Sequence, residues 1–201
     1  MSRTPDEAVS GVVLAGGRST RFGRDKLTVT YRGRPLLHHA VLSLLEACDD
    51  VIVVVASDGD ELPMPDGVAV RSVRDRTADE GPLRGLEAAL AAAGGRWVLV
   101  AGGDMPDLQV PVLLEMLRAG RETHAVAVAL SDGGDARPLP IALDLEPARR
   151  AVGELLRGGR RSLRDLLAAV TTVVVDEPTW TALDPERRTV FDIDEPADLG
   201  P

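Results

Sequence analysis

Apolar residues in this chain follow two alternating patterns. Short apolar runs, such as residues 9–14 and 51–56, are typical of strands buried on both faces of a parallel sheet. Between such runs, apolar residues recur every three or four positions, as in residues 34–48, and this spacing predicts amphipathic helices. Alternation of this kind predicts an α/β fold, in which a mainly parallel sheet has helices on both faces.

The pattern predicts the position of each element. We expect strands at residues 9–14, 51–56, 68–73, 97–104, 124–130 and 171–175, and a short one at 139–143. We expect helices at residues 34–48, 83–93, 110–119, 148–156 and 161–169, with Pro35 in the first turn of the first helix and Ser162 capping the last. Residues 131–138 are expected to form a turn or loop, and Trp180 to lie in a loop.

Length and composition narrow the class of protein. A chain of 201 residues without an internal linker is expected to form one domain, residues 1–201, with residues 1–8 as a flexible tail. A net charge of −9 and only 2% aromatic residues argue against a nucleic-acid partner. No apolar run is long enough to span a membrane. Cys48 is the single cysteine, so no disulfide framework is expected and the cytoplasm is the expected location.

A glycine-rich basic stretch follows the first strand. Gly16 and Gly17 allow close approach of the backbone to a ligand, and Arg21 and Lys26 bring positive charge to the same turn. Neither the P-loop pattern nor the dinucleotide pattern GxGxxG fits this stretch. These residues indicate a phosphate-binding loop, with a solvated basic turn as the alternative.

A carboxylate ends a second buried strand, in the stretch Ala101-Gly102-Gly103-Asp104-Met105-Pro106. Ligands of open α/β sheets bind at the carboxyl ends of the strands. Mg²⁺ prefers one or two carboxylates together with phosphate oxygens, so Asp104 is a candidate ligand. The alternative is that Asp104 caps the following helix.

The order of residues in the glycine-rich stretch resembles the signature loop of the MobA-like nucleotidyltransferases. The shared positions are Leu14-Ala15-Gly16-Gly17-x-Ser19-x-Arg21-x-Gly23-x-Asp25-Lys26, and the second glycine and the Asp-Lys pair are similar to the molybdenum cofactor guanylyltransferase branch. The resemblance implies a three-layer, Rossmann-like α/β/α fold like that of the nucleotide-diphospho-sugar transferases. It implies nucleotide binding by Leu14, Ala15, Gly16, Gly17 and Gly23, neutralisation of phosphate charge by Arg21 and Lys26, and Mg²⁺ binding by Asp104.

Three further stretches resemble segments of the same family. Asp75 and Gly81 match an Asp and a GPL element that contact the nucleotide, and the alternative for Asp75 is a surface ion pair. The ending from Asp192 to Leu199 resembles the family's NINTPEDL ending, with Asp192 and Asp194 in place of asparagines. One of these two could add a carboxylate to the metal site, because alternate residues of a strand face opposite ways, or Asp194 could cap a helix.

The third segment, residues 137–140 (Arg-Pro-Leu-Pro), resembles one that lines the acceptor side of the cleft. Arg160, Arg161 and Arg164 could meet an anionic acceptor, and a solvated basic face is the alternative.

The resemblance implies an enzyme that moves GMP from GTP to the terminal phosphate of a molybdopterin-type cofactor and releases pyrophosphate. Arg21, Lys26 and Asp104 would be its catalytic residues, and the protein would be a monomer or a weak homo-oligomer. The alternatives are a cytidylyltransferase, or another MobA-like enzyme with a different phosphorylated acceptor. A degenerate relative that binds nucleotide or cofactor as a partner protein is the non-enzyme alternative.

Overall fold

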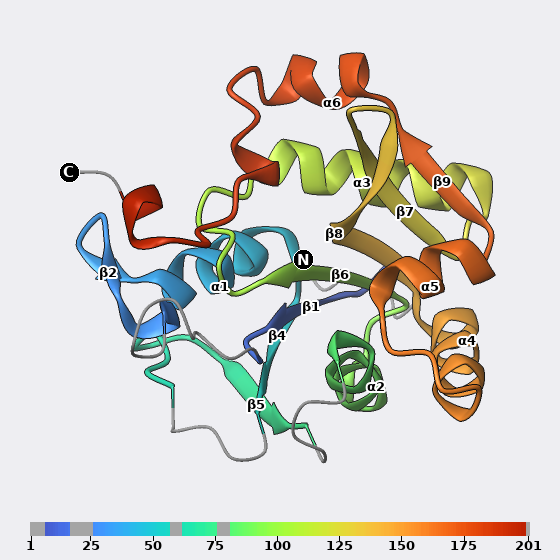
Figure 1. Ribbon diagram of the computed structural model, residues 1–201, viewed down its shortest axis with the longest axis horizontal. Coiled ribbons are helices and arrows are strands. Elements are labelled where there is room, and N and C mark those ends of the chain that lie inside the picture. Colours follow the sequence, from blue (N-terminus) through green and yellow to red (C-terminus); the bar gives the residue numbers. More distant parts are fainter. Residues whose placement is uncertain (1–6, 17–25, 57–61, 76–80, 200–201) are drawn as a thin grey trace.

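A seven-stranded sheet forms the centre of the computed structural model, which describes residues 7–16, 26–56, 62–75 and 81–199 (Figure 1). The strand order is β5-β4-β1-β6-β8-β7-β9. The strands are β1 (Val9–Leu14), β4 (Asp50–Val55), β5 (Val70–Arg74), β6 (Trp97–Gly102), β7 (Ala127–Asp132), β8 (Asp135–Asp144) and β9 (Thr172–Val175). A separate hairpin joins β2 (Thr30–Tyr31) and β3 (Arg34–Pro35).

Most neighbouring strands of this sheet are parallel. Strand β1 pairs in parallel with both β4 and β6, and β4 pairs in parallel with β5. Strand β8 runs antiparallel to both of its neighbours, β6 and β7, whereas β9 is parallel to β7. The predicted α/β fold with a mainly parallel sheet is therefore confirmed.

Helices cover both faces of the sheet, which gives three layers (Figure 1). One face is covered by α1 (Leu36–Ala47), α3 (Val110–Thr123) and α6 (Glu177–Leu183). The other face is covered by α2 (Pro82–Ala92), α4 (Leu145–Arg157) and α5 (Leu163–Ala169). The described residues also include three 3₁₀ helices: η1 (Lys26–Thr28), η2 (Arg188–Val190) and η3 (Pro196–Leu199).

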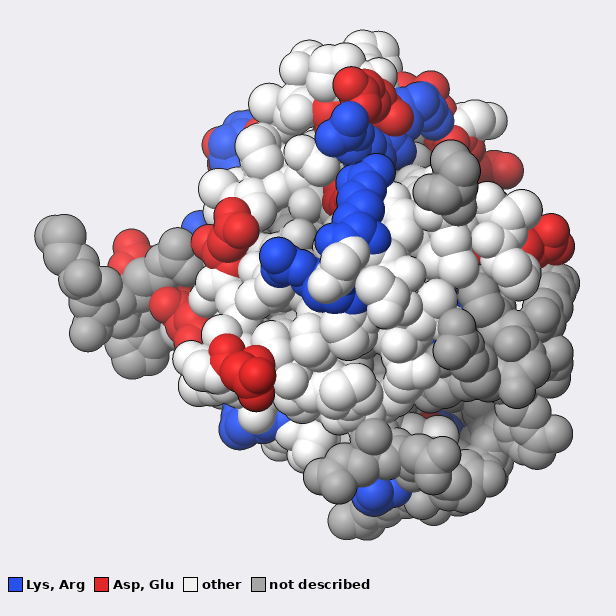
Figure 2. Space-filling model, turned by 90° about the vertical axis from the view of Figure 1, so that its left-hand side faces the viewer, with Lys and Arg blue, Asp and Glu red and all other residues white. Residues whose placement is uncertain are grey.

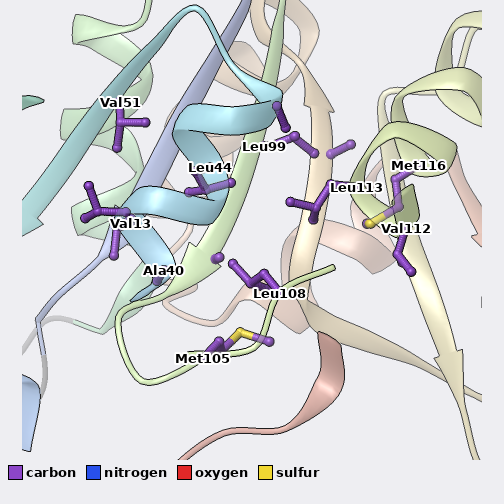
Figure 3. Packing of buried hydrophobic residues seen from close by; sticks show 14 of the residues in the cluster. Val13, Ala40, Leu44, Val51, Leu99, Met105, Leu108, Val112, Leu113 and Met116 are labelled. Atoms are coloured by element: carbon purple, nitrogen blue, oxygen red, sulfur yellow. The ribbon is translucent and has the colours of Figure 1, made fainter. Parts of the chain in front are cut away.

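Successive residues of the central strands enter different cores. Val12 packs with α2 on one side of the sheet, while Val13 packs with α1 on the other, and both are fully buried. Because both faces are covered, these strands have apolar residues at consecutive positions rather than at alternate ones. Figure 3 shows how Leu44 and Leu113 from two different helices converge on Leu99 of β6.

The hairpin of β7 and β8 corrects the predicted loop at residues 131–138. Gly133 and Gly134 form its turn with φ values of +62° and +90°, a left-handed conformation that two-residue hairpin turns require. Strand β8 is consequently ten residues long and includes the short strand expected at residues 139–143. Asp-Gly-Gly-Asp between two apolar runs is a hairpin signal of the sequence, and it explains the antiparallel strand.

Two helix predictions also need correction. Trp180 lies in helix α6 instead of a loop, where it is fully buried and its Nε1 donates a hydrogen bond to the Ser131 carbonyl over 2.9 Å. Pro35 precedes α1 as its N-cap residue instead of occupying its first turn. The predicted cap of α5 is confirmed, because the Ser162 side chain accepts a hydrogen bond from the Asp165 backbone N–H.

In the described part of the chain, no helix combines the length and apolar character that crossing a membrane requires.

Helix α3 approaches β6 so closely that Gly120 has no room for a side chain. A Cβ at Gly120 would lie 2.3 Å from the Trp97 ring, whereas a Cβ at Gly153 in α4 would meet nothing within 4 Å. We expect Gly120→Ala to lower the free energy of unfolding by about 1–3 kcal/mol through overpacking. Gly153→Ala should raise it by about 0.5–1 kcal/mol, because alanine favours the helix. Urea denaturation of both variants checks this, and equal effects would contradict the packing.

Candidate nucleotide site at the strand ends

The carboxyl ends of β1 and β6 lie side by side. In their parallel register Leu14 is opposite Gly102, and the Gly103 N–H donates a hydrogen bond to the Leu14 carbonyl over 3.0 Å. Ala15 continues away from the strand and donates to the Val54 carbonyl of β4 over 2.9 Å. The residues that follow β1 therefore begin beside Asp104, as predicted from the ends of parallel strands.

Lys26 and Asp104 form the polar centre of this site. The Lys26 ammonium lies 2.8 Å from Asp104 Oδ2 and 3.1 Å from Asp194 Oδ1, and it donates to the Ile193 carbonyl over 3.0 Å. Burial lowers the pKa of Lys26, but the hydrogen bonds and charges of Asp104 and Asp194 outweigh burial and raise that pKa. The ammonium is therefore ionised at neutral pH and acts as a fixed positive charge.

The end of the chain is held against this centre by the backbone. Ile193 is fully buried and its N–H donates to the Asp104 carbonyl over 2.9 Å. Residues 192–195 belong to no strand, so the expectation that strand alternation would separate Asp192 from Asp194 does not apply. Asp198, rather than Asp194, accepts the backbone N–H groups of residues 194 and 195 that lead into η3.

Asp75 and Gly81 have different surroundings. Asp75 follows β5. A Cβ added at Gly85 of α2 would lie 3.8 Å from Asp75 Oδ2 and 3.9 Å from Leu14 Cδ2. The Asp75 carboxylate therefore lies near the start of the glycine-rich stretch. Gly81 has a φ of +84° at the N-cap of α2, where a Cβ would lie 2.9 Å from the Arg161 carbonyl oxygen. Packing against Arg161 therefore requires glycine at position 81, independently of any ligand.

Three sequence-predicted positions, Gly17, Arg21 and Gly23, lie outside the described residues. Gly16 is described, and a Cβ added there would meet nothing within 4 Å. The structure thus brings Leu14 and Ala15, at the end of β1, together with Lys26 of η1 and Asp104, which follows β6.

A cavity of about 380 Å³ adjoins Asp104. Its walls come from the start of the β6–α3 connection, the β7–β8 hairpin, the first turn of α5 and the C-terminal segment. They are formed by Asp104, Met105, Asp132, Asp135, Ala136, Arg137, Pro138, Leu139, Arg164 and Asp192. Sequence reasoning missed Asp132 and Asp135, because recognising their place requires the hairpin. Of the three arginines of residues 160–164, Arg164 lines this cavity.

The acidic residues around the cavity can accommodate a cation. Burial raises the pKa of Asp192, the charges of Asp194 and Asp104 raise it further, and Arg137 opposes this. A divalent cation near Asp104 and Asp192 would relieve the crowding of negative charge. Among the described residues, no group of three or more His, Cys, Asp and Glu side chains is arranged to hold a metal ion. A metal here would therefore need oxygens from a substrate as well, as Mg²⁺ commonly does.

Figure 2 shows a stripe of basic side chains on one face of the molecule, with acidic side chains at its upper end. Two arginines near Tyr31 are each paired with a carboxylate: Arg32 with Asp107 at 2.8 Å and Arg188 with Glu186. Neither arginine lines the cavity beside Asp104.

The two described glycines of the predicted nucleotide site should respond differently to substitution. Gly81→Ala should lower the free energy of unfolding by about 1–3 kcal/mol, because φ is strained for alanine and the Cβ meets the Arg161 carbonyl. Gly16→Ala should change it by less than about 0.5 kcal/mol, because its Cβ enters open space. Thermal and urea unfolding measure both; a stable Gly81→Ala variant would contradict the tight packing at this position.

Comparison with known proteins places this chain in a family. Residues 11–174 match the model of the MobA-like NTP transferase domain. A protein from Opitutus terrae is 36% identical over 81% of this chain and 79% of its own length, and one from Mycobacterium avium is 35% identical over 95% and 93%. Both are named probable molybdenum cofactor guanylyltransferase.

Solved structures share the fold. The molybdopterin-guanine dinucleotide biosynthesis protein A of Archaeoglobus fulgidus has a TM-score of 0.73 at 23% identity, with 94% of each chain covered. Rv0371c of Mycobacterium tuberculosis, solved in complex with manganese, has a TM-score of 0.59 at 21% identity, covering 85% of this chain and 89% of its own. The family match over most of the chain confirms the resemblance that was based on the loop after β1, and this protein belongs to the MobA-like NTP transferase family.

Proposed function

We propose that this nucleotidyltransferase is a molybdenum cofactor guanylyltransferase, which moves GMP from GTP to the terminal phosphate of a molybdopterin-type cofactor. The observation that carries this proposal is the ion pair between Lys26 and Asp104 beside the ends of β1 and β6. A cavity large enough for an acceptor adjoins this pair. The names of relatives that are aligned over most of the chain support the choice of reaction.

The nucleotide side of the site follows the glycine-rich stretch. We propose that Leu14, Ala15, Gly16, Gly17 and Gly23 hold the triphosphate through the backbone, and that Arg21 and Lys26 neutralise its charge. On binding, the triphosphate would compete with Asp104 and Asp194 for the Lys26 ammonium, which those carboxylates hold at 2.8 and 3.1 Å. The raised pKa of Lys26 supports a role in electrostatic stabilisation rather than as a general base.

The base would be read by Asp75. Its carboxylate lies over α2 near Leu14, and a carboxylate can accept hydrogen bonds from the adjacent N1–H and N2 amino groups of guanine. Cytosine lacks this pair of donors. Gly81 would also contribute to nucleotide binding from its position at the start of α2, in addition to its packing against Arg161.

The reaction needs positioning more than proton transfer. The acceptor phosphate is ionised at neutral pH and would attack the α-phosphorus in line, while pyrophosphate leaves from the opposite side. The residues of the nucleotide site and of the cavity would hold the two substrates together in the in-line arrangement and exclude other arrangements. Lys26 and Arg21 would stabilise the charge that develops on the leaving pyrophosphate.

Mg²⁺ is the metal that we propose for the site. Asp104 would hold it, with Asp192 or Asp194 as a further carboxylate. When bound, it supplies positive charge to the phosphate oxygens of the nucleotide. The manganese in the related Rv0371c structure supports a divalent metal in this fold.

Two alternative functions differ from this proposal in the base or in turnover. The family's ending has asparagines at the positions of Asp192 and Asp194. This difference is the reason for keeping a cytidylyltransferase, or an enzyme with another acceptor, as an alternative. A degenerate partner protein would bind ligands without turnover. We propose further that the chain works as one domain in the cytoplasm, as a monomer or a weak homo-oligomer, without a nucleic-acid partner.

Removing either member of the Lys26–Asp104 pair should abolish turnover and leave the fold intact. We expect Lys26→Ala and Asp104→Ala to lower kcat at least about 100-fold, because each removes charge stabilisation of the transition state. Arg118→Ala is the matched control, since it also removes an ion-paired cation but lies on α3 with Glu115 and Glu122. Near wild-type rates in both site variants, measured with Mg·GTP and acceptor, would contradict the site.

Nucleotide selectivity can be measured through thermal stability. At a GTP concentration about 100 times Kd, binding contributes about 2.7 kcal/mol, which should raise Tm by roughly 5–10 °C for a chain of this size. The rise should require Mg²⁺, be lost with EDTA, and exceed that with CTP, ATP or UTP. Selective stabilisation by CTP would favour the cytidylyltransferase. Mass spectrometry of products formed from Mg·GTP and molybdopterin cofactor should then detect a guanine dinucleotide.

A further inference from the structure

One carboxylate beside the cavity is shared by two arginines. Asp132 ends β7, and its Oδ2 lies 2.9 Å from Arg137 Nη1 while its Oδ1 lies 2.7 Å from Arg187 Nη2. Arg137 lines the cavity and Arg187 does not. Because both oxygens of Asp132 are engaged, the position of Arg187 restricts the orientation of the carboxylate that holds Arg137.

Arg187 is itself held firmly. It adopts a left-handed conformation, with φ of 56° and ψ of 31°, which residues with a side chain rarely adopt. Its guanidinium lies 4.9 Å from the centre of the Trp180 ring, and its Nη1 lies 3.4 Å from Glu177 Oε2. A planar guanidinium that stacks and pairs at the same time loses orientational freedom.

Helix α6 binds the hairpin on both sides of Asp132. Trp180 Nε1 donates to the Ser131 carbonyl over 2.9 Å, and the Gly133 N–H donates to Glu177 Oε1 over 2.5 Å. The residues before and after Asp132 are thus fixed by the same helix that supports Arg187. This C-terminal segment lies beyond residues 11–174, which match the family model.

Arg137 has hydrogen-bonding capacity left for a ligand. Its Nε donates to the Leu139 carbonyl over 3.2 Å, and its Nη2 lies 3.3 Å from Asp192 Oδ1. With Asp132, these contacts engage three of the five N–H groups of the guanidinium with described residues. Two N–H groups remain for the oxygens of a molecule in the cavity. Guanidinium groups suit phosphate oxygens, which they can bind in a bidentate manner.

We propose that Arg137 binds the phosphate monoester of the acceptor and that Arg187 is a positioning residue that acts on Arg137 through Asp132. This inference rests on the proposed function for the identity of the acceptor. Arg187 pairs with Asp132 and Glu177 and stacks on Trp180, on the hairpin side of the cavity, so the effect should fall on acceptor affinity rather than on nucleotide affinity. If Arg187 only stabilised the fold, its substitution would change the free energy of unfolding without a selective loss of acceptor affinity.

The test compares dissociation constants of the full-length protein for molybdopterin cofactor and for Mg·GTP, measured by equilibrium dialysis. Arg137→Gln and Arg187→Gln should each weaken acceptor binding about tenfold, the effect of losing one charge-assisted hydrogen bond. Mg·GTP affinity should stay unchanged. Arg188→Gln is the matched control, because Arg188 is adjacent but pairs with Glu186 away from the cavity.

Two further variants separate positioning from folding. Arg187→Gly removes the side chain and also relieves the left-handed backbone, so loss of acceptor affinity in this variant cannot come from backbone strain. Arg187→Lys keeps a cation near Asp132 and should recover part of the affinity. The double variant Arg137→Gln/Arg187→Gln should bind acceptor no more weakly than Arg137→Gln alone, because the two residues act in one chain of contacts.

Several outcomes would overturn the inference. These are unchanged acceptor affinity in Arg187→Gln and Arg187→Gly, additive losses in the double variant, or an equal loss of Mg·GTP affinity. Dephosphorylated cofactor should bind wild-type and Arg187→Gln protein equally, and a difference would overturn the assignment of the phosphate. Wild-type protein that binds no acceptor would overturn both proposals. Transfer of CMP in place of GMP would overturn only the proposed base and leave the comparison of variants valid.

Discussion

The parallel pairing of β1 with both β4 and β6 is the constraint on which the site depends. Parallel strands in register end at the same edge of a sheet, so β1 ends with Leu14 opposite Gly102, and Asp104 follows two residues later. The buried apolar residues of β1 enter both cores, and a one-residue shift would exchange those faces. The packing of the core therefore also fixes the position of the end of β1 relative to the carboxylate.

Charge at this edge is balanced locally, although the whole chain is acidic. Lys26 lies between Asp104 and Asp194, and Arg137 lies between Asp132 and Asp192. Two cations thus separate the carboxylates of one cleft. This arrangement keeps the positive groups in place, and under the proposed function phosphate groups of the substrates would replace carboxylates as their partners. Such preorganised charge is the main contribution that a protein can make to phosphoryl-group transfer.

The C-terminal segment connects the two sides of the cleft. Ile193 binds the backbone of Asp104, while Asp192 pairs with Arg137. Helix α6 and Arg187 hold the hairpin from which Arg137 extends. The residues after β9 therefore contact both the carboxyl end of β6 and the β7–β8 hairpin. Their contribution is to hold side chains from distant strands at fixed separations.

Local sequence determined the strand-and-helix alternation and the place of the carboxylate after β6, because apolar spacing and strand ends are short-range signals. The resemblance of residues 14–26 to one family added the chemistry. Only the tertiary structure decided the position of β8 between β6 and β7, the burial of Trp180 in α6, the need for glycine at Gly81 and the sharing of Asp132 by two arginines. These features depend on contacts between residues far apart in the chain, such as Ser131 with Trp180, Gly81 with Arg161 and Asp132 with Arg187, which leave no periodic pattern in the chain.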